Sequence, residues 1–185
     1  MIKKELRSRY RAVRDNVYDR ELKSDIITSA VIENEFFVNS KEVFLYSPSG
    51  SEVFTNKISD AAHRLGKRIA YPRCIDRDGE MEFYFVDSHL SLCEGMYGIY
   101  EPCSNESKIA VPSSESLIIV PALTYDLYGY RLGYGKGYYD RYLSRYPCKT
   151  VGIAFDECVC KELPHGIYDC KINCLITDKS IYYFD

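Results

Sequence analysis

Residues 116–143 read SLIIVPALTYDLYGYRLGYGKGYYDRYL and combine an apolar run, a glycine-rich segment and a pattern typical of a helix. The apolar run SLIIVPA (116–122) is typical of a β-strand that is covered on both faces. Four glycines follow within residues 129–137, and the next segment, YYDRYLSRY (138–146), lacks glycine and places Tyr139 and Leu143 four residues apart. The stretch therefore predicts a central strand, then a glycine loop, then a helix.

A glycine loop that opens a helix is a candidate anion site. Glycine lets the backbone approach a ligand closely, and the first N–H groups of a helix have no partner within the helix. Phosphate is the obvious anion. The alternative is that the glycines only form a turn and bind no ligand. The spacing matches neither G-x-G-x-x-G nor the P-loop, because Lys136 precedes Gly137 and no Ser or Thr follows.

The segments on either side predict alternating strands and helices. EVFLYSP (42–48), SGSEVFTNKISDAAHRLGK (49–67) and RIAYPR (68–73) indicate a strand, a capped helix that ends near Gly66 and a parallel strand. Helices are also expected over residues 1–15 and 18–37, and strands at MEFYFV (81–86, near an edge), TVGIAF (150–155) and NCLITD (173–178). We predict a single three-layer α/β domain over residues 1–185, with a mostly parallel central sheet flanked by helices and the glycine loop at the carboxyl end of a central strand.

The composition indicates a globular protein. The chain has 185 residues, of which 46% are hydrophobic and 28% charged, and a formal net charge of -3, which argues against a protein that coats nucleic acid. The N-terminal MIKKELRSRYRAVRD is charged throughout, and no apolar run reaches the length of a membrane span. We expect a cytoplasmic monomer that binds neither nucleic acid nor a membrane.

Eight cysteines raise the question of a metal site. Cys158 with Cys160, and Cys170 with Cys174, offer four thiolates, but neither pair has the C-x2-C spacing usual for zinc. We therefore expect scattered reduced thiols, several of them buried as small hydrophobic side chains.

Three blocks together resemble the 5-formyltetrahydrofolate cyclo-ligase family, also called 5,10-methenyltetrahydrofolate synthetase. They are YSPSGSEVFT (46–55), PALTYDLYGYRLGYGKGYYDRYL (121–143) and LPHGIYDCKINCLITD (163–178). The pattern R-L-G-x-G-x-G-x-Y-D, residues 131–140 here, is the most specific part, and the resemblance covers essentially the whole chain. The chain departs from the family pattern at Cys158, Tyr168 and Asn173.

The resemblance implies an ATP- and Mg²⁺-dependent cyclisation of 5-formyltetrahydrofolate to 5,10-methenyltetrahydrofolate, with release of ADP and phosphate. A formamide oxygen is a poor leaving group. Transfer of the γ-phosphoryl group to that oxygen creates an imidate-type phosphate; N10 of the folate attacks its carbon, and phosphate then departs. The protein has to align the two substrates and stabilise the charge on the transferring group.

The resemblance also implies roles for particular residues. Arg131 and Lys136 would supply catalytic positive charge. The ATP contacts would be Lys3, Arg7, Arg131, Leu132, Gly133, Tyr134, Gly135, Lys136, Gly137, Tyr138 and Tyr139. The folate contacts would be Ser47, Glu52, Tyr134 and Tyr138, and the Mg²⁺ ligands would be Asp140 and Asp169.

Purely structural roles are also possible for several of these residues. Asp140 would compensate the dipole of the helix it begins, Glu52 would cap its own helix, and the cations of residues 3–14 would form a solvated helix face. Two other functions are also open. One is a sugar-phosphate isomerase whose glycine loop holds the substrate phosphate, and the other is an RNA-binding module that uses the Tyr, Arg and Lys side chains of residues 125–146.

Overall fold

An eight-stranded sheet runs through the part of the chain that this structure, a computed structural model, describes: residues 2–103 and 108–184. Its strands follow the order β13-β12-β10-β7-β1-β2-β3-β6. In that order their bounds are Ile181–Tyr183, Cys174–Ile176, Lys149–Ile153, Ser116–Val120, Glu42–Phe44, Arg68–Cys74, Met81–Val86 and Ile109–Ala110. The five strands from β12 to β2 are parallel, and β13, β3 and β6 add antiparallel pairs at the edges.

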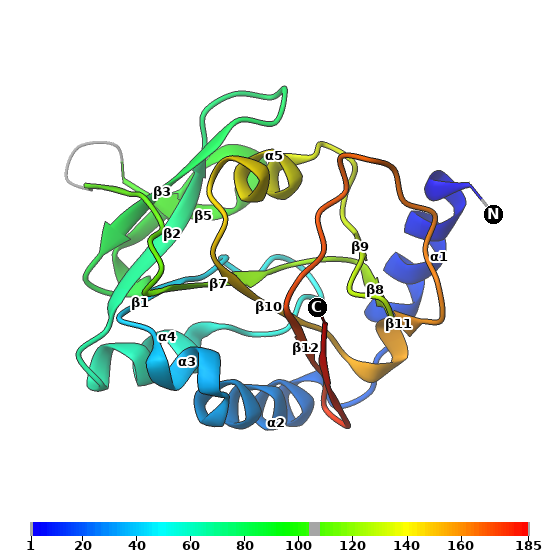
Figure 1. The fold of residues 1–185 in the computed structure, drawn as a ribbon, viewed down its shortest axis with the longest axis horizontal. Helices are drawn as coiled ribbons and strands as arrows, with labels where there is room; N and C mark the ends of the chain where they lie inside the picture. Colours follow the sequence, from blue (N-terminus) through cyan, green and yellow to red (C-terminus); the bar gives the residue numbers. More distant parts are fainter. Residues whose placement is uncertain (1, 104–107, 185) are drawn as a thin grey trace.

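Five α-helices in the described residues cover the sheet (Figure 1). Helices α2 (Arg20–Glu33), α3 (Glu35–Asn39) and α4 (Asn56–Arg64) lie on one face, and α5 (Tyr138–Arg145) lies on the other. Helix α1 (Lys3–Asp15) packs at one end of the molecule, where its Leu6 and Tyr10 meet Leu123, Leu132 and Leu163. The predicted three-layer α/β fold with a mostly parallel sheet is confirmed.

The order in which strands are added to the sheet reverses between β1 and β7, although these two strands are parallel. Strand β2 follows β1 on one side, whereas β7, β10 and β12 extend the sheet on the other side. Such a reversal leaves a crevice at the carboxyl ends of the two strands, and open α/β sheets bind ligands there. The segment after β1 carries Glu52, and the segment after β7 carries Ala122, so both reach this crevice.

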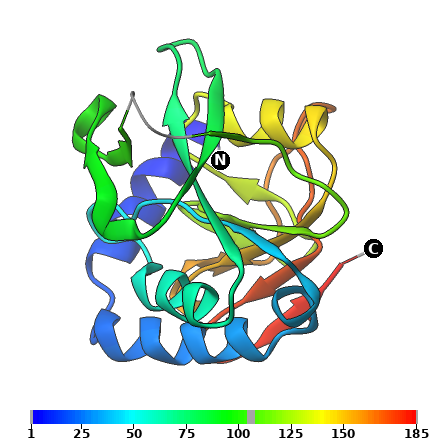
Figure 2. The same cartoon turned by 90° about the vertical axis from the view of Figure 1, so that its left-hand side faces the viewer.

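Smaller elements frame the same edge of the sheet. A three-stranded sheet joins β11 (Val159–Cys160), β8 (Thr124–Asp126) and β9 (Arg131–Leu132) beside α1. The β2–β3 hairpin stands out on the α5 side of the molecule (Figure 2). Neither the small sheet nor the edge strand β13 was predicted, because two- and three-residue strands carry too little periodicity to be recognised.

Three boundaries differ most from the prediction. The helix expected over 18–37 breaks at Asn34, whose side-chain oxygen accepts the N–H of Phe36 and caps α3. The strand expected over 42–48 ends at Phe44. The helix expected from residue 49 begins only at Asn56, because buried hydrogen bonds from Tyr46 Oη to the Val53 carbonyl and from Thr55 Oγ1 to the Tyr46 carbonyl fold the intervening residues into a loop.

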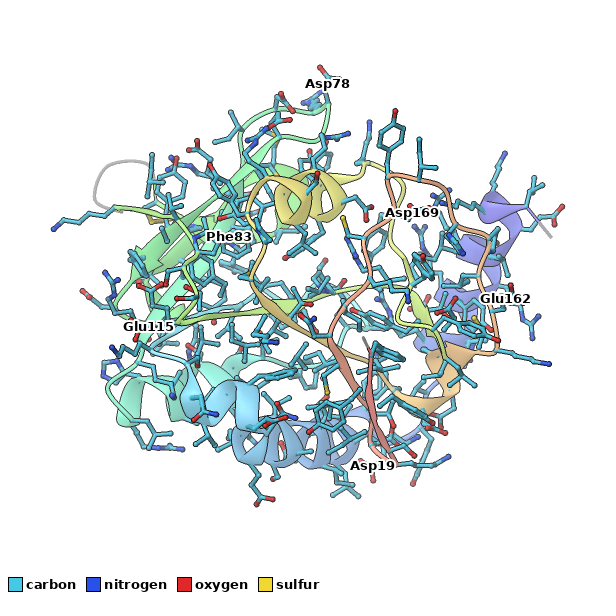
Figure 3. All side chains as sticks on the ribbon, in the orientation of Figure 1. Asp19, Asp78, Phe83, Glu115, Glu162 and Asp169 are labelled. Atoms are coloured by element: carbon cyan, nitrogen blue, oxygen red, sulfur yellow. A yellow bond between two sulfur atoms is a disulfide. The ribbon has the colours of Figure 1, made fainter. Side chains whose placement is uncertain are left out.

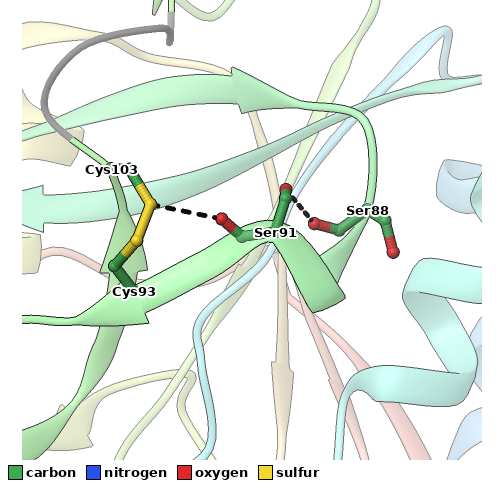
Figure 4. Close-up of a disulfide and its surroundings, with 4 residues drawn as sticks. All are labelled: Ser88, Ser91, Cys93 and Cys103. Atoms are coloured by element: carbon green, nitrogen blue, oxygen red, sulfur yellow. Dashed lines mark hydrogen bonds between the residues drawn. A yellow bond between two sulfur atoms is a disulfide. The ribbon is translucent and has the colours of Figure 1, made fainter.

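The expectation that all cysteines are reduced is wrong for one pair. Cys93 on β4 (Leu92–Glu94) forms a disulfide with Cys103, which follows β5 (Tyr100–Pro102), and the bond closes this hairpin (Figure 4). Sγ of Cys103 lies 3.4 Å from the Ser91 carbonyl oxygen. Antiparallel pairing of β4 with β5 brings the two side chains together, which sequence spacing alone does not reveal.

Candidate active site

The glycine loop, residues 133–137, connects β9 to α5. Gly135 has a φ of 103° and Gly137, the residue before α5, has a φ of 74°, so both occupy the left-handed region that glycine adopts without strain. The first N–H groups of α5 point out of the helix next to this loop. The prediction of a glycine loop that opens a helix is confirmed.

Helix α1 places two cations beside this loop. Nε of Arg7 donates to the Gly133 carbonyl at 2.9 Å, and a Cβ on Gly135 would lie 3.1 Å from Cζ of Arg7. One turn earlier, Nζ of Lys3 lies 2.7 Å from Oδ2 of Asp169. The Leu132 side chain is buried against α1, and this apolar contact explains why the helix lies over the loop.

Arg131 lies inside the site rather than on its surface, since only 4% of its side chain is exposed. Its Nη1 donates to the Cys170 carbonyl at 2.7 Å, and its Nη2 donates to Oδ1 of Asp140 at 2.8 Å. The Cys170 N–H donates to the same oxygen at 3.1 Å. Arg131 and Asp140 therefore tie α5 to the segment that carries Asp169.

Lys136 contrasts with Arg131. Its side chain is exposed and has no hydrogen bond or ion pair to another described residue. Its carbonyl accepts a hydrogen bond from Arg141, which also donates through Nε to the Gly79 carbonyl at 3.1 Å and through Nη2 to the Asp78 carbonyl at 2.6 Å. The tip of the β2–β3 hairpin, where Asp78 lies, is thus fastened to the glycine loop (Figure 3).

The other end of the site surrounds Glu52, whose side chain is only 8% exposed. Oε1 of Glu52 accepts a hydrogen bond from the Tyr134 hydroxyl at 2.9 Å, and Oε2 accepts one from the Ser49 N–H at 2.9 Å. Arg14 approaches Oε1 to 3.6 Å. The helix cap considered for Glu52 is absent from the described residues, because Glu52 lies in a loop ahead of α4.

A cavity of about 10 Å³, the space of a single water molecule, adjoins this carboxylate. Arg14, Glu52, Ala122 and Cys158 lie among its lining residues. Burial raises the pKa of Glu52, while the Ser49 N–H, the charge of Arg14 and the Tyr134 hydroxyl act in the opposite direction. Burial raises the pKa of Cys158 to about 12, so this thiol is protonated at neutral pH.

The two carboxylates expected to bind a metal both lie close to Cys170, because the Cys170 N–H donates to Oδ1 of Asp140 and Asp169 precedes Cys170 in the chain. Asp140 uses Oδ1 for Arg131 and for the Cys170 N–H, whereas Oδ2 accepts no hydrogen bond from the described residues. Burial opposes ionisation of Asp169, but its bonds with Lys3 and the Gly166 N–H outweigh burial and lower its pKa. Within residues 2–103 and 108–184 no group of three or more His, Cys, Asp or Glu side chains is arranged as a metal site.

Comparison with known proteins shows the family of the chain. The family model for the 5-formyltetrahydrofolate cyclo-ligase family matches residues 1–178. The chain belongs to this family.

Relatives of this cyclo-ligase family match over most of their length. A probable 5-formyltetrahydrofolate cyclo-ligase from Schizosaccharomyces pombe is 33% identical, with 90% of this chain and 88% of the relative aligned. The 5-formyltetrahydrofolate cyclo-ligase of Mus musculus is 28% identical over 97% of this chain and 93% of its own length. The resemblance stated from the sequence is confirmed, and membership makes the protein an enzyme of the cyclo-ligase class.

Solved structures of cyclo-ligase relatives have the same fold. The NMR structure of the Aquifex aeolicus 5,10-methenyltetrahydrofolate synthetase is 34% identical, has a TM-score of 0.85, and aligns over 99% of this chain and 93% of that one. A 5,10-methenyltetrahydrofolate synthetase from Mycoplasma pneumoniae is 23% identical with a TM-score of 0.77, over 96% of this chain and 99% of that one, which bears on the fold alone.

The structure brings together most residues that the family resemblance singled out. The glycine loop, residues 133–137, is surrounded by Lys3, Arg7, Arg131, Asp140 and Asp169. At the other end of the site, Glu52 contacts Tyr134. Ser47 lies half-buried in the loop that leads to Glu52. Tyr138 donates to the Asp76 carbonyl at 2.7 Å, so its hydroxyl faces the β2–β3 hairpin.

Tyr139 turns its hydroxyl into the interior of the protein. Its ring packs against Phe83, and its buried hydroxyl has no hydrogen-bond partner among the described residues. Burial raises the pKa of this hydroxyl first, and the charge of Glu52 raises it further.

Sequence reasoning missed two arginines of the site. Arg14 was grouped with the solvated cations of the first helix, but only 7% of its side chain is exposed. Arg141 was not considered, although it joins the hairpin tip to the glycine loop. One signal for Arg14 was present: Tyr10, Val13 and Arg14 follow Leu6 at helical spacing, which places Arg14 beside the apolar face of α1.

None of the helices within residues 2–103 and 108–184 is long and apolar enough to cross a membrane.

Proposed function

We propose that the protein uses MgATP to convert 5-formyltetrahydrofolate to 5,10-methenyltetrahydrofolate, with release of ADP and phosphate. One observation carries this proposal beyond family membership: Tyr134, a residue of the glycine loop, donates its hydroxyl hydrogen to Glu52. A candidate phosphate site and a candidate site for an N–H-rich heterocycle therefore share one residue. A reaction that joins a nucleotide phosphate to a folate atom needs this proximity.

In the proposed reaction the γ-phosphoryl group passes from ATP to the oxygen of the 5-formyl group. N10 then attacks the formyl carbon, its proton leaves to solvent or a base, and the carbon–oxygen bond breaks with release of phosphate. The chain has no covalent role in these steps. It aligns the formyl oxygen with the γ-phosphorus and stabilises the negative charge that the phosphoryl oxygens carry.

Gly133 supports a phosphate site at the glycine loop. Its φ lies outside the left-handed region, and a Cβ built on it meets no atom within 4 Å. The fold of the chain therefore does not require glycine here, whereas close approach of a phosphate to the backbone would. Lys3, Arg7 and Lys136 would add positive charge around this position.

Arg131 would act from within the site. Because Asp140 and the Cys170 carbonyl occupy two of its donors, its position is fixed before any substrate binds. A preorganised charge stabilises a transition state without a reorganisation cost during the reaction. Lys136, which is exposed and unpaired among the described residues, would instead close onto the nucleotide.

The donor set fits a magnesium ion held largely by nucleotide phosphates. Oδ2 of Asp140 has no competing hydrogen bond from the described residues, and Asp169 is the chain neighbour of Cys170, whose N–H donates to Oδ1 of Asp140. Magnesium takes oxygen ligands and is bound in nucleotide sites by one or two carboxylates together with phosphate and water. When bound there, the ion would offset the charge on the β- and γ-phosphates.

Glu52 would bind the heterocycle of the folate. A carboxylate accepts hydrogen bonds from the amino group and ring N–H of an aminopyrimidinone, and each oxygen of Glu52 accepts only one short hydrogen bond from the described residues. Ser47 would lie on the same side of the ligand, and the rings of Tyr134 and Tyr138 would contact its faces or edges.

The test is a spectrophotometric assay that follows the near-ultraviolet absorbance of the methenyl product. Purified protein is mixed with 5-formyltetrahydrofolate, ATP and Mg²⁺, with parallel samples that omit ATP or Mg²⁺. We expect product only in the complete mixture. A folded protein that forms no product in the complete mixture, or an equal amount without ATP, would contradict the proposal.

We further infer that residues 1–185 act as one domain. The expected monomeric state and cytoplasmic location stay predictions.

A further inference from the structure

Arg14 makes the densest set of polar contacts of any α1 side chain in the described residues, although the proposed reaction gives it no role. Its Nε donates to Ser51 Oγ at 3.1 Å, Nη1 to the Ala122 carbonyl at 3.2 Å, and Nη2 to the Tyr134 hydroxyl at 2.6 Å. Nη1 also lies 3.6 Å from Oε1 of Glu52. One side chain thus joins α1 to the segments that follow β1 and β7 and to the glycine loop.

These contacts fix the direction of a hydrogen-bond chain. A guanidinium group only donates hydrogen bonds, and an ionised carboxylate only accepts them. The Tyr134 hydroxyl accepts from Arg14 and must therefore direct its own hydrogen at Glu52. Ser51 behaves in the same way, since it accepts from Arg14 and donates to Asp15 at 2.5 Å.

The Tyr134 ring is anchored at one end and open at the other. The residue is 49% exposed, yet its hydroxyl lies between Arg14 and the buried Glu52. Both Arg14 and Arg11 lie over the ring, with Cζ 5.7 Å and 5.8 Å from its centroid. An exposed aromatic ring held by its polar tip offers a flat surface in a defined orientation.

We propose that Arg14 is a positioning residue for the heterocycle of the substrate. It keeps Glu52 ionised as an acceptor for N–H groups and holds the Tyr134 ring as a platform for a flat ligand. This inference rests on the proposed function, which assigns the Glu52 end of the site to the folate.

The charge of Arg14 also predicts how its loss would change the pH dependence. Burial raises the pKa of Glu52, and Arg14 counteracts that rise. The titratable groups near the guanidinium include Asp15, Glu52, the Cys158 thiol and the hydroxyls of Tyr46 and Tyr134. Without the positive charge the carboxyl of Glu52 would take up its proton at a higher pH. The acidic limb of the pH profile, where folate-dependent activity falls as the pH is lowered, would therefore move to higher pH.

The experiment compares Arg14→Met, Arg14→Lys and Arg9→Met in the full chain. Arg9 is an exposed arginine of the same helix that contacts Tyr10, so Arg9→Met is the matched control. We expect Arg14→Met to raise KM for 5-formyltetrahydrofolate by about 10- to 100-fold and to leave KM for MgATP within about twofold. The acidic limb of kcat/KM for the folate should move to higher pH in Arg14→Met, and Arg9→Met should behave as wild type.

Arg14→Lys separates charge from geometry. A lysine keeps the charge beside Glu52 but lacks the planar fork that reaches Ser51, Ala122 and Tyr134 together. We expect its acidic limb to stay near that of the wild type while KM for the folate still rises. An equal rise of KM for both substrates, or an unchanged acidic limb in Arg14→Met, would overturn the positioning role.

Two further measurements test the proposal if Arg14→Met does not fold or if the protein shows no turnover. Should Arg14→Met not fold, Tyr134→Phe keeps the ring but removes the hydroxyl between Arg14 and Glu52, and we expect weaker folate binding with unchanged MgATP binding. Calorimetric binding of 5-formyltetrahydrofolate without ATP tests both variants independently of turnover. A wild-type chain that binds the folate without converting it would overturn the proposed reaction alone, whereas one that binds no folate would overturn both.

Discussion

The two ends of the site hold their charges in opposite ways. Around the glycine loop the outer cations are exposed or half-exposed, as with Lys136 and Lys3. Around Glu52 both members of the ion pair are buried, with Arg14 7% and Glu52 8% exposed. An exposed charge costs little to maintain, whereas a buried charge persists only with its partner in place. The loop end thus suits a ligand that brings its own charge, and the Glu52 end suits a neutral heterocycle.

Arg131 combines features of both ends of the site. It belongs to the loop end by sequence, yet it is as buried as Arg14 and is held by Asp140 and the Cys170 carbonyl. The loop end therefore combines fixed charge inside with movable charge outside. Substitutions that separate these contributions test the comparison directly.

The largest effect is expected from Asp140→Asn. Asparagine keeps a side-chain oxygen for Arg131 and the Cys170 N–H, so the protein should still fold, with a lower melting temperature because the buried Arg131 loses its ion pair. Loss of the carboxylate charge also removes the expected magnesium ligand. We predict a fall in kcat of about 10²- to 10³-fold. Steady-state kinetics over a range of Mg²⁺ concentrations, with thermal melting as the control, is the measurement. Unchanged kcat would remove Asp140 from the metal site.

Glu52→Gln tests the buried end. The amide keeps the size of the side chain but donates where the substrate also donates, so kcat/KM for 5-formyltetrahydrofolate should fall about 10- to 100-fold while KM for MgATP stays nearly constant. Because the folded-state pKa of Glu52 is raised above 4.5, the wild type should lose folate-dependent activity as the pH falls through that raised pKa. The variant should lack this acidic limb, and a pH profile with the limb retained would assign it to another group.

Gly133→Ala and Gly135→Ala form a matched pair within the loop. A Cβ on Gly133 meets open space, so this variant should melt like the wild type but raise KM for MgATP about tenfold, because the methyl group keeps phosphate from the backbone. A Cβ on Gly135 faces Arg7 at 3.1 Å with a φ of 103°, so this variant should lose about 1 kcal/mol or more of stability as well. Kinetics and urea unfolding separate the two outcomes, and a Gly133→Ala enzyme with normal use of MgATP would contradict the phosphate site.

Lys136→Ala should have the smallest effect. Its exposed side chain has no partner among the described residues, so the free energy of unfolding should stay within about 0.5 kcal/mol of the wild type. KM for MgATP should rise about five- to tenfold, and KM for the folate should not change. A larger effect on the folate would move Lys136 to the other end of the site.

Much of the glycine-loop end was predictable because it lies in one short stretch. Residues 131–140 supply the loop, the helix start and Asp140, and local backbone preferences of glycine dictate their arrangement. The Glu52 end was predicted only in part. The resemblance singled out Glu52 and Tyr134, but the helix cap considered for Glu52 was wrong, because tertiary hydrogen bonds of Tyr46 and Thr55 hold that segment in a loop.

The sequence by itself determined the order of the main helices and of the central strands, the glycine loop and the family, since each depends on local periodicity or on motifs of adjacent residues. Only the tertiary structure decided that Arg14 is buried against Glu52, that Arg131 faces inward and that Cys93 meets Cys103. Whether a charged side chain meets water or a partner depends on residues 38 to 120 positions away, as Glu52 and Tyr134 are from Arg14. Local sequence preferences carry no information on such pairs, because packing of the whole chain brings them together.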